Sequence, residues 1–245
     1  MKLAVLAAIL TVFVSLSGPD DPGLTAARKA RDGGDVRALQ VEITKTEKKA
    51  EETKSFEDYL RLALLHDYMC EAAESSNTHG LVKEAAQSGV AAAEIAVKLN
   101  PNSSQAHQLL ADLLGQLAPN VTGGGMKYGQ RSTDEADKAI ELDQKNGDAY
   151  VTRAISYLYT PEAFGGNKQK AFEFFSKAKQ LDPQADSPHI WLALFHLEAG
   201  KIDDALREIN EARQLSPGRK FAEFVLEQVS ANKKAGKSLG ALARP

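Results

Sequence analysis

The sequence predicts an all-α protein built as a solenoid of antiparallel helix pairs. A set of residues recurs after 34 positions, and apolar residues between them are spaced about one helical turn apart. The first copies are Leu158, Gly166, Ala171, Ala178, Leu181 and Pro183, and their counterparts are Leu192, Gly200, Ala205, Ala212, Leu215 and Pro217. A period of this size is typical of stacked helical units that bury their apolar faces against one another.

The unit over residues 187–217 predicts two antiparallel helices that meet at Gly200. Glycine readily takes the left-handed conformation that ends a helix, and Pro217 cannot continue one. Small side chains at Ala193, Ala205 and Ala212 let the two backbones approach closely. One repeat is therefore an αα-hairpin.

This pattern resembles the tetratricopeptide repeat (TPR), whose motif places aromatic, small and proline residues at set positions in each repeat. The residues that match it in one copy are Tyr150, Ala154, Tyr157, Ala171, Phe175, Ala178 and Pro183. The resemblance implies the TPR fold and a platform for protein interaction. It does not identify a partner, because one fold serves many functions.

The first residues have the layout of a secretory signal peptide over 1–17. Lys2 precedes an apolar run over 3–14, and a small-x-small ending stands before Gly18. The run is shorter than the ~20 apolar residues that cross a bilayer. A buried or interfacial first helix and an uncleaved anchor are the alternatives. We expect an exported protein, periplasmic or secreted, without a membrane span in the mature chain.

The rest of the chain is predicted to be one TPR-like helical domain over 24–234, between a flexible lead-in at 18–23 and a disordered tail at 235–245. About five helix pairs are expected, followed by a C-terminal capping helix that covers the apolar end of the array. The helices are expected at 24–31, 36–52, 56–75, 81–99, 103–117 and 127–142, in two pairs within 149–181 and 187–217, and at 220–233.

The first helix of each pair is expected to line a concave groove, where TPR proteins commonly bind extended peptides or helices. The positions that match this groove are Gln108, Leu109, Asp112, Val151, Thr152, Ile155, Tyr159, Ile190, Trp191, Leu194 and Glu198. They are largely apolar, where the carboxylate-clamping subset has Lys, Arg and Asn, so we expect an amphipathic helix or an apolar segment as partner. The alternative is that the chain's own last helix covers Trp191 and Leu194.

Two inserted loops form the second candidate site. Residues 118–125 and 160–167 replace the same short turn in successive repeats, so they are expected to project side by side from one edge. Each contains Pro near its start and Gly-Gly near its end, a geometry that glycine readily adopts. The residues of this loop edge are Pro119, Gly124, Pro161, Phe164, Gly165 and Gly166. Phe164 either contacts a ligand or tucks back over the helix ends.

No catalytic, metal or cofactor site is predicted. The histidines lack H-E-x-x-H spacing, and no serine lies in G-x-S-x-G. The single cysteine, Cys70, is expected to be a small buried hydrophobe, and His66 and His196 are expected to pack where the TPR motif often has Tyr. Carboxylates are expected on solvated helix faces. A formal net charge of −3 without a basic patch argues against nucleic acid.

Three classes of function follow from these expectations. The leading hypothesis is a non-catalytic exported TPR scaffold or adaptor that holds another protein through the groove or the loop edge. The alternative is a ligand-binding or transport-accessory protein that takes a small apolar molecule in its groove. An enzyme is the third class, and no residue pattern supports it.

Overall fold

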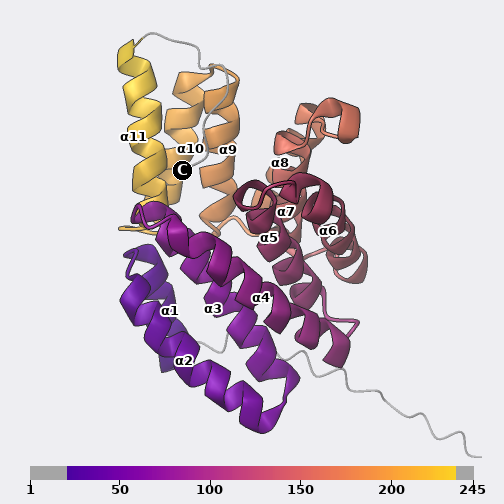
Figure 1. Cartoon of the computed structure of the whole chain (residues 1–245). Coiled ribbons are helices and arrows are strands. Elements are labelled where there is room, and N and C mark those ends of the chain that lie inside the picture. The colour runs from indigo at the N-terminus through magenta and orange to yellow at the C-terminus, as the bar shows by residue number, and fades with distance from the viewer. Residues whose placement is uncertain (1–20, 236–245) are drawn as a thin grey trace, which may run out of the picture.

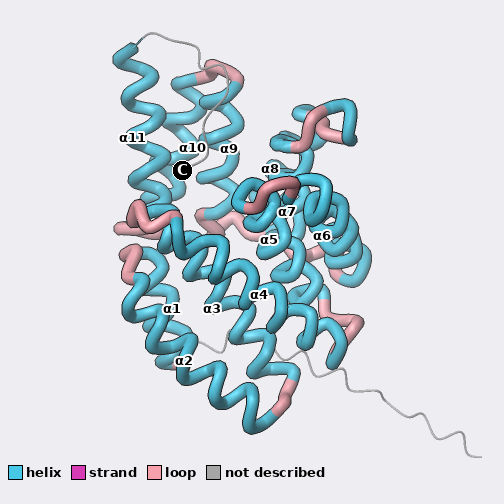
Figure 2. The backbone as a smooth tube through the Cα atoms, in the orientation of Figure 1, coloured by secondary structure: helices cyan, strands magenta, loops and turns pink. Residues whose placement is uncertain are grey.

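The computed structural model describes residues 21–235, which form α-helices, one 3-10 turn, one π turn and no strand (Figures 1 and 2). The elements in chain order are α1 (Pro22–Asp32), α2 (Val36–Thr53), α3 (Phe56–Ser75), α4 (Gly80–Leu99), α5 (Ser104–Asn120), η1 (Gly125–Gly129), α6 (Gln130–Leu142), α7 (Gly147–Tyr159), η2 (Glu162–Phe164), α8 (Lys168–Leu181), α9 (Ser187–Glu198), α10 (Ile202–Leu215) and α11 (Lys220–Ala235).

Successive helices pack as antiparallel pairs, α1 with α2 through to α9 with α10, and α11 follows as an unpaired helix. The predicted all-α solenoid of five pairs plus a capping helix is therefore confirmed. Ala171 of α8 and Ala205 of α10, which occupy the same place in the repeat, are both fully buried. The predicted repeat register is correct at both positions.

Local sequence explains where most helices begin. A helix leaves its first N–H groups without partners, and a Ser or Asn side chain before the first turn can accept from one of them. Such caps accept from the N–H three residues later at Ser55, Ser103, Asn146 and Asn167. At the other end, Gly200 stands between α9 and α10 with a φ of 72°. The left-handed backbone expected there is present.

The start of α1 differs from the sequence expectation. Asp21 accepts hydrogen bonds from the N–H groups of Gly23 and Leu24, and Pro22 occupies the first helical position. Proline is well suited to that position, because its missing N–H would be unpaired anyway. The flexible lead-in predicted over 18–23 is therefore wrong for Pro22 and Gly23, which belong to the helix. The predicted signal peptide over 1–17 lies outside the described residues.

The end of the chain agrees with the expected capping helix and extends it. Helix α11 runs to Ala235, which the sequence placed in a disordered tail, and the remaining residues 236–245 lie outside the described part. Val225 and Val229 of α11 are fully buried against α9 and α10. The last pair of the array therefore has its apolar face covered.

The array also curves until its two ends meet. Helix α3 packs on α5, α5 on α7, α7 on α9, α9 on α11, and α11 returns to α3. We call these five helices the helix ring. Figure 1 shows α11 beside α10, with its lower end close to the indigo and purple N-terminal helices. The concave side of the array, where the groove was expected, is therefore bounded at its end by the contact between α11 and α3.

Candidate functional site

The predicted groove residues lie on helices of the ring, and most of them are packed. Buried members of the set are Gln108, Leu109, Val151, Thr152, Ile190 and Leu194, and half-buried members are Asp112, Ile155, Tyr159, Trp191 and Glu198. These side chains fill the space between neighbouring helices of the ring. What remains accessible is a narrower surface than an open apolar groove.

Trp191 shows how the groove is covered. Its ring lies 5.8 Å from the ring of Phe221 on α11 and 6.4 Å from the parallel ring of Phe175 on α8. Tyr159 contacts it edge-on, also at 6.4 Å. Trp191 therefore joins two apolar clusters of the core, and the alternative in which the last helix covers it is the one that the structure has.

Three carboxylates lie on successive ring helices, beside the packed apolar residues. Asp148 of α7 raises the pKa of both Asp67 of α3 and Asp112 of α5, and Asp67 also raises the pKa of Asp112, so the three carboxylates lie near one another. Asp67 and Asp112 are partly buried and Asp148 is exposed. Burial and repulsion from Glu71 raise the pKa of Asp67 to about 7. The expectation that carboxylates lie on solvated faces is wrong for Asp67 and Asp112.

Asp112 is held in place by two neighbouring side chains. Gln108 Nε2 donates to one of its oxygens, and Thr152 Oγ1 donates to the other at 2.5 Å. These bonds stabilise the ionised form, but burial and the charge of Asp67 raise the pKa of Asp112 well above its ordinary value. The three predicted groove residues therefore form a polar contact between α5 and α7.

Two arginines neutralise the neighbouring acids. Arg219, which precedes α11, donates to both oxygens of Glu71 on α3 at 2.8 and 2.6 Å, and to Asp186 before α9 at 2.5 Å. Arg31 of α1 lies 3.8 Å from Glu71 and stacks over Tyr68. Burial alone would raise the pKa of Glu71, but the charge and bonds of Arg219 hold it below its usual range.

The sequence did not reveal this ion network, because its members lie at four separate places in the chain: on α1, on α3, just before α9 and just before α11. The one local signal is the turn before α11, where Gly218 has a φ of 86° and directs the chain back towards the ring. Arg219 itself has only 5% of its surface exposed. A buried arginine requires carboxylate partners, but sequence alone does not say which ones.

The loop edge is built by two glycine pairs with the same geometry. Gly123 and Gly165 have positive φ values of 71° and 97°. Each of these glycines is followed by a second one that has no room for a side chain. A Cβ added to Gly124 would lie 2.6 Å from the Ala118 carbonyl oxygen, and a Cβ added to Gly166 would lie even closer to the Thr160 carbonyl oxygen. Since no side chain fits there, the expectation that these turns need glycine is confirmed.

The first loop is shorter than predicted. Pro119, expected at its start, lies instead in the last turn of α5, which ends at Asn120. A proline there removes one N–H near the helix end, and the Asn120 side chain donates back to the Gln116 carbonyl at 2.8 Å. Pro161 is placed as expected, and it opens the second loop before the 3-10 turn η2.

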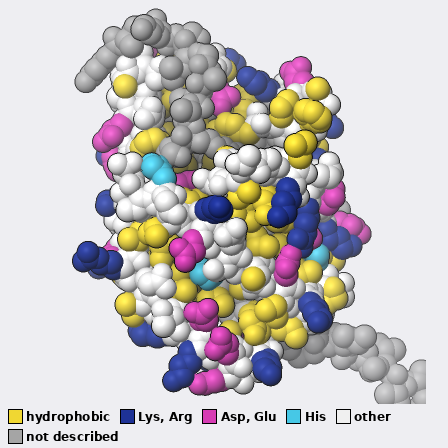
Figure 3. Space-filling model, viewed as in Figure 1, with side chains coloured by type: hydrophobic (Ala, Val, Ile, Leu, Met, Phe, Trp, Pro, Cys, Tyr) yellow, Lys and Arg dark blue, Asp and Glu magenta, His cyan; other side chains and the backbone are white. Residues whose placement is uncertain are grey.

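Large apolar side chains project from both loops. Phe164 is 80% exposed and Met126 is 90% exposed, more than any other large hydrophobic residue that the structure describes. The interpretation in which Phe164 tucks back over the helix ends is therefore wrong. Figure 3 shows hydrophobic side chains gathered over the connection between α7 and α8, at the upper right. Met126 was not among the predicted site residues.

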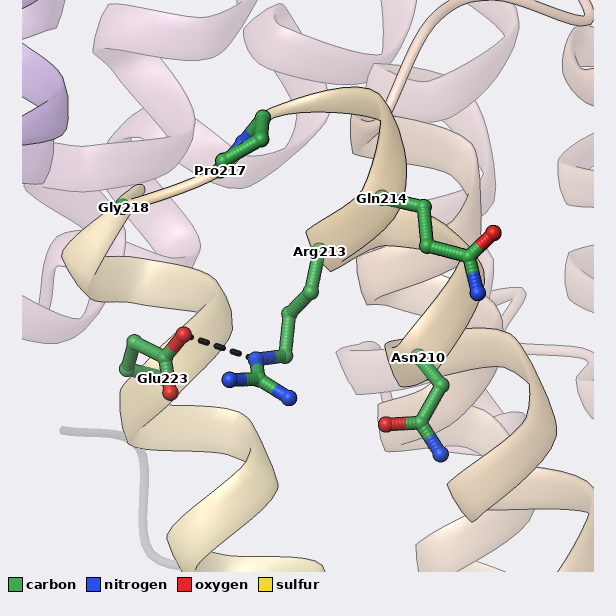
Figure 4. Close-up of a pocket in the computed structure, with 6 residues that line it drawn as sticks. All are labelled: Asn210, Arg213, Gln214, Pro217, Gly218 and Glu223. Atoms are coloured by element: carbon green, nitrogen blue, oxygen red, sulfur yellow. Dashed lines mark hydrogen bonds and ion pairs between the residues drawn. The ribbon is translucent and has the colours of Figure 1, made fainter.

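Two shallow hollows lie on the other side of the array. One of about 410 Å³ lies between α10 and α11, where Arg213 Nε donates to Glu223 at 2.7 Å (Figure 4). The other, of about 620 Å³, contains Glu208, which accepts from Lys179 and lies 2.7 Å from His189 Nδ1. The first exposes more polar than apolar surface, and the second exposes more apolar than polar surface although charged side chains line it. Among the described residues, no three His, Cys, Asp or Glu side chains are grouped as metal ligands are.

Comparison with known proteins supports the repeat architecture. No family model matches the sequence. A thermophilic TPR protein of Thermus thermophilus has a crystal structure that superposes with a TM-score of 0.61, at 16% identity, over 85% of this chain and 98% of that one. The chain has a TPR fold.

Two curated proteins are similar in sequence to part of this TPR chain. A DnaJ homolog subfamily C member 3 homolog of Dictyostelium discoideum is 27% identical over 124 residues, 49% of this chain. Regulator of microtubule dynamics protein 3 of Bos taurus is 28% identical over 179 residues, 66% of this chain. The matches span only 21% and 37% of the lengths of those proteins.

Histidines occupy aromatic positions of the TPR motif in this chain. His107 and His189 correspond to Tyr150 in the repeat, and each bonds a glutamate of the paired helix, at 2.6 Å to Glu135 and 2.7 Å to Glu208. They are buried and join helices within pairs. His66 and His196 fill the Tyr position and are at least partly buried, as expected. Burial lowers the pKa of His66 to about 4.

Proposed function

We propose that this protein is a non-catalytic TPR scaffold that holds another protein in the cell envelope or outside the cell. The bound segment is an amphipathic helix or peptide that carries basic side chains. The observation behind this proposal is the set of three carboxylates, Asp67, Asp112 and Asp148, on successive helices of the ring. None of them forms an ion pair with a described Lys or Arg, because Arg31 and Arg219 pair with other acids.

A cationic segment complements these carboxylates. Unpaired carboxylates in a partly dehydrated surface are raised in free energy, and a Lys or Arg from a partner lowers it. Tyr159 and Ile155 remain half-buried on the same helix as Asp148 and supply apolar contact area. TPR domains commonly bind extended peptides or helices on this side of the array, which also favours this surface.

A peptide-binding measurement tests the proposal. We would titrate the protein into a fluorescent amphipathic helix of alternating Leu and Lys pairs, and follow anisotropy. Asp148→Lys should weaken binding at least tenfold, because it puts a positive charge where the basic peptide binds. Asp148 is exposed, so the replacement leaves the core intact. Glu141→Lys, on the outer helix α6, is the matched control and should leave affinity unchanged. A Leu–Glu peptide that binds equally well would contradict the proposal.

The alternative is a carrier of a small apolar molecule. It has less support, because Leu109 and Ile190 of the predicted groove are packed in the core, and both hollows are shallow and lined largely by polar or charged residues. Mass spectrometry of the protein purified under native conditions distinguishes the two. A stoichiometric lipid or metabolite would favour the carrier, whereas a protein recovered with wild type but not with Asp148→Lys favours the scaffold.

The proposed location rests on the apolar run and cleavage signal in residues 1–17. None of the described helices is both long and apolar enough to cross a bilayer. Expression in a bacterial host, with cell fractionation and N-terminal sequencing, tests the location. Recovery of the chain beginning at Gly18 in the periplasm supports export, and recovery of the intact chain in the cytoplasm contradicts it.

A further inference from the structure

The loop edge has a property that a scaffold role alone does not require. Met126 and Phe164 are 90% and 80% exposed, while the other exposed large hydrophobic residues of the described chain range from 37% to 53%. Each lies in the connection from the first to the second helix of its pair, so both belong to one edge of the array. Single exposed apolar residues are ordinary on a protein surface, but large apolar side chains exposed together at one edge mark an interaction site.

Ordered backbone holds Phe164 in this exposed position. The N–H of Phe164 donates to the Pro161 carbonyl at 2.8 Å, and the N–H of Asn167 donates to the Tyr157 carbonyl at 2.9 Å. Asn167 then caps α8, and Gly166 is pressed against Thr160. Phe164 projects from a loop that is closed by hydrogen bonds at both ends. Its exposure is therefore a feature of the folded turn.

The first loop holds Met126 in a similar way. Its glycine turn is closed by the N–H of Gly124, which donates to the Val121 carbonyl at 2.8 Å. The N–H of Lys127 donates to the Gly123 carbonyl at 3.2 Å, within the π turn that carries Met126. Met126 thus stands just beyond a glycine pair, as Phe164 stands just before one.

Positive charge surrounds both apolar tips. Residues 121–131 and 160–170 contain four basic side chains, Lys127, Arg131, Lys168 and Lys170, and a single acidic one, Glu162. All four basic residues are exposed, although Arg131 is paired with Glu94. The whole chain has a net charge of −3, so the positive sign of this edge is a local departure.

This combination of features fits one kind of surface. A folded protein partner would need a preformed pocket for each tip, whereas the boundary between headgroups and acyl chains opens around inserted Phe and Met side chains. Lysines beside the tips match the negative phosphates of anionic lipids. We propose that the loop edge, residues 121–131 and 160–170, docks on an anionic phospholipid bilayer, with Met126 and Phe164 inserted among the lipids.

The membrane contact is peripheral and leaves the ring free. Only two side chains enter the lipid, and the lysines stay at the phosphates. Because Asp67, Asp112 and Asp148 lie on helices α3, α5 and α7 and outside the two loops, they are separate from the loop edge. The inference therefore does not depend on the peptide partner proposed above, and the two can fail independently.

A position-specific fluorescence measurement tests the docking. An environment-sensitive dye is attached to Phe164→Cys or Met126→Cys in the full chain, since Cys70 is buried and unreactive. Vesicles of equal parts phosphatidylglycerol and phosphatidylcholine should shift the emission of both dyes to the blue, and vesicles of phosphatidylcholine alone should not. The control is Val41→Cys on α2, a 53% exposed apolar position away from the loops, which should show no shift.

A charge variant provides the second readout. Lys168→Glu with Lys170→Glu should lower the vesicle partition coefficient by about tenfold or more, because each basic residue near the bilayer surface contributes roughly a fivefold gain. The proposal is overturned if the dyes at 126 and 164 keep their emission in water while the protein sediments with vesicles. It is equally overturned if the double lysine variant partitions like wild type, or if no partition occurs.

Discussion

Arg219 donates hydrogen bonds to both carboxylate oxygens of Glu71, a residue 148 positions earlier in the chain, and so joins the last helix to the third. The same guanidinium also bonds Asp186. The contact closes the helix ring, and the side chains of Arg219, Glu71 and Asp186 are largely buried, with 6%, 20% and 11% of their side-chain surfaces exposed. The first prediction follows from this burial.

Replacing Arg219 with Met should destabilise the protein by about 3 kcal/mol, because it leaves buried Asp186 without its cation and Glu71 with only the more distant Arg31. Urea unfolding followed by circular dichroism measures the change. The matched control is Arg213→Met, whose partner Glu223 is 42% exposed, and it should cost less than about 1 kcal/mol. If both variants lose the same free energy of unfolding, the Arg219 contact contributes no more stability than an exposed ion pair does.

Asp67→Asn should stabilise the protein at pH 8 and have little effect at pH 4. The folded pKa of Asp67, about 7, lies above the usual value, so native Asp67 is protonated where the unfolded chain is already ionised. Stability from this group is complete below pH ~4 and is lost as the pH rises towards 7.

Melting temperatures of wild type and Asp67→Asn at pH 4 and pH 8 check this. The expected gain at pH 8 is on the order of 2 kcal/mol, less than the full pKa shift would give, because Asp67 keeps some solvent contact. Asp143→Asn, at an inter-repeat joint, serves as the control. A loss of stability in Asp67→Asn at both pH values would mean that the ionised form is needed.

Gly166→Ala should destabilise the second loop by roughly 1–3 kcal/mol, because a Cβ there meets the Thr160 carbonyl oxygen and the backbone must strain or move. Thermal unfolding measures the loss. Gly125→Ala is the matched control, since nothing lies within 4 Å of a Cβ at that position and its φ is not positive. The prediction does not hold if the two variants melt at the same temperature.

Trp191→Ala should lower stability by about 3 kcal/mol, near the lower end for a large aromatic residue, because Trp191 is only half-buried. It loses ring contacts with Phe175 and Phe221, so the α9–α11 end of the array should loosen. Differential scanning calorimetry measures the effect. An unchanged melting temperature with weaker peptide binding would instead make Trp191 a contact residue.

The repeat pattern predicted the helix pairs because the signals that define them are local. Ser55 caps α3, and the predicted span of that helix, 56–75, matches Phe56–Ser75 in the structure. Alanines at fixed steps predicted where helices touch, since small side chains are needed wherever two backbones approach. The end of α5 was misplaced because Pro119 marks a helix end only to within a turn.

The candidate sites were less predictable, because they depend on how the array curves. Leu109 and Ile190 match groove positions, but the sequence does not state the angle between successive pairs, and that angle decides whether the groove opens or closes. Asp67 looked like an ordinary helical carboxylate for the same reason. Phe164 was placed on the correct loop, but its orientation depends on the turn formed by Gly165 and Gly166.

The return of α11 to α3 changes how the molecule responds to stress. An open repeat array can extend and contract along its axis. Its last repeats can also unfold locally without affecting the first ones. In the helix ring each of the five helices contacts two others, so opening one junction strains the rest. This protein should consequently resist stretching and should lose its structure in one cooperative step.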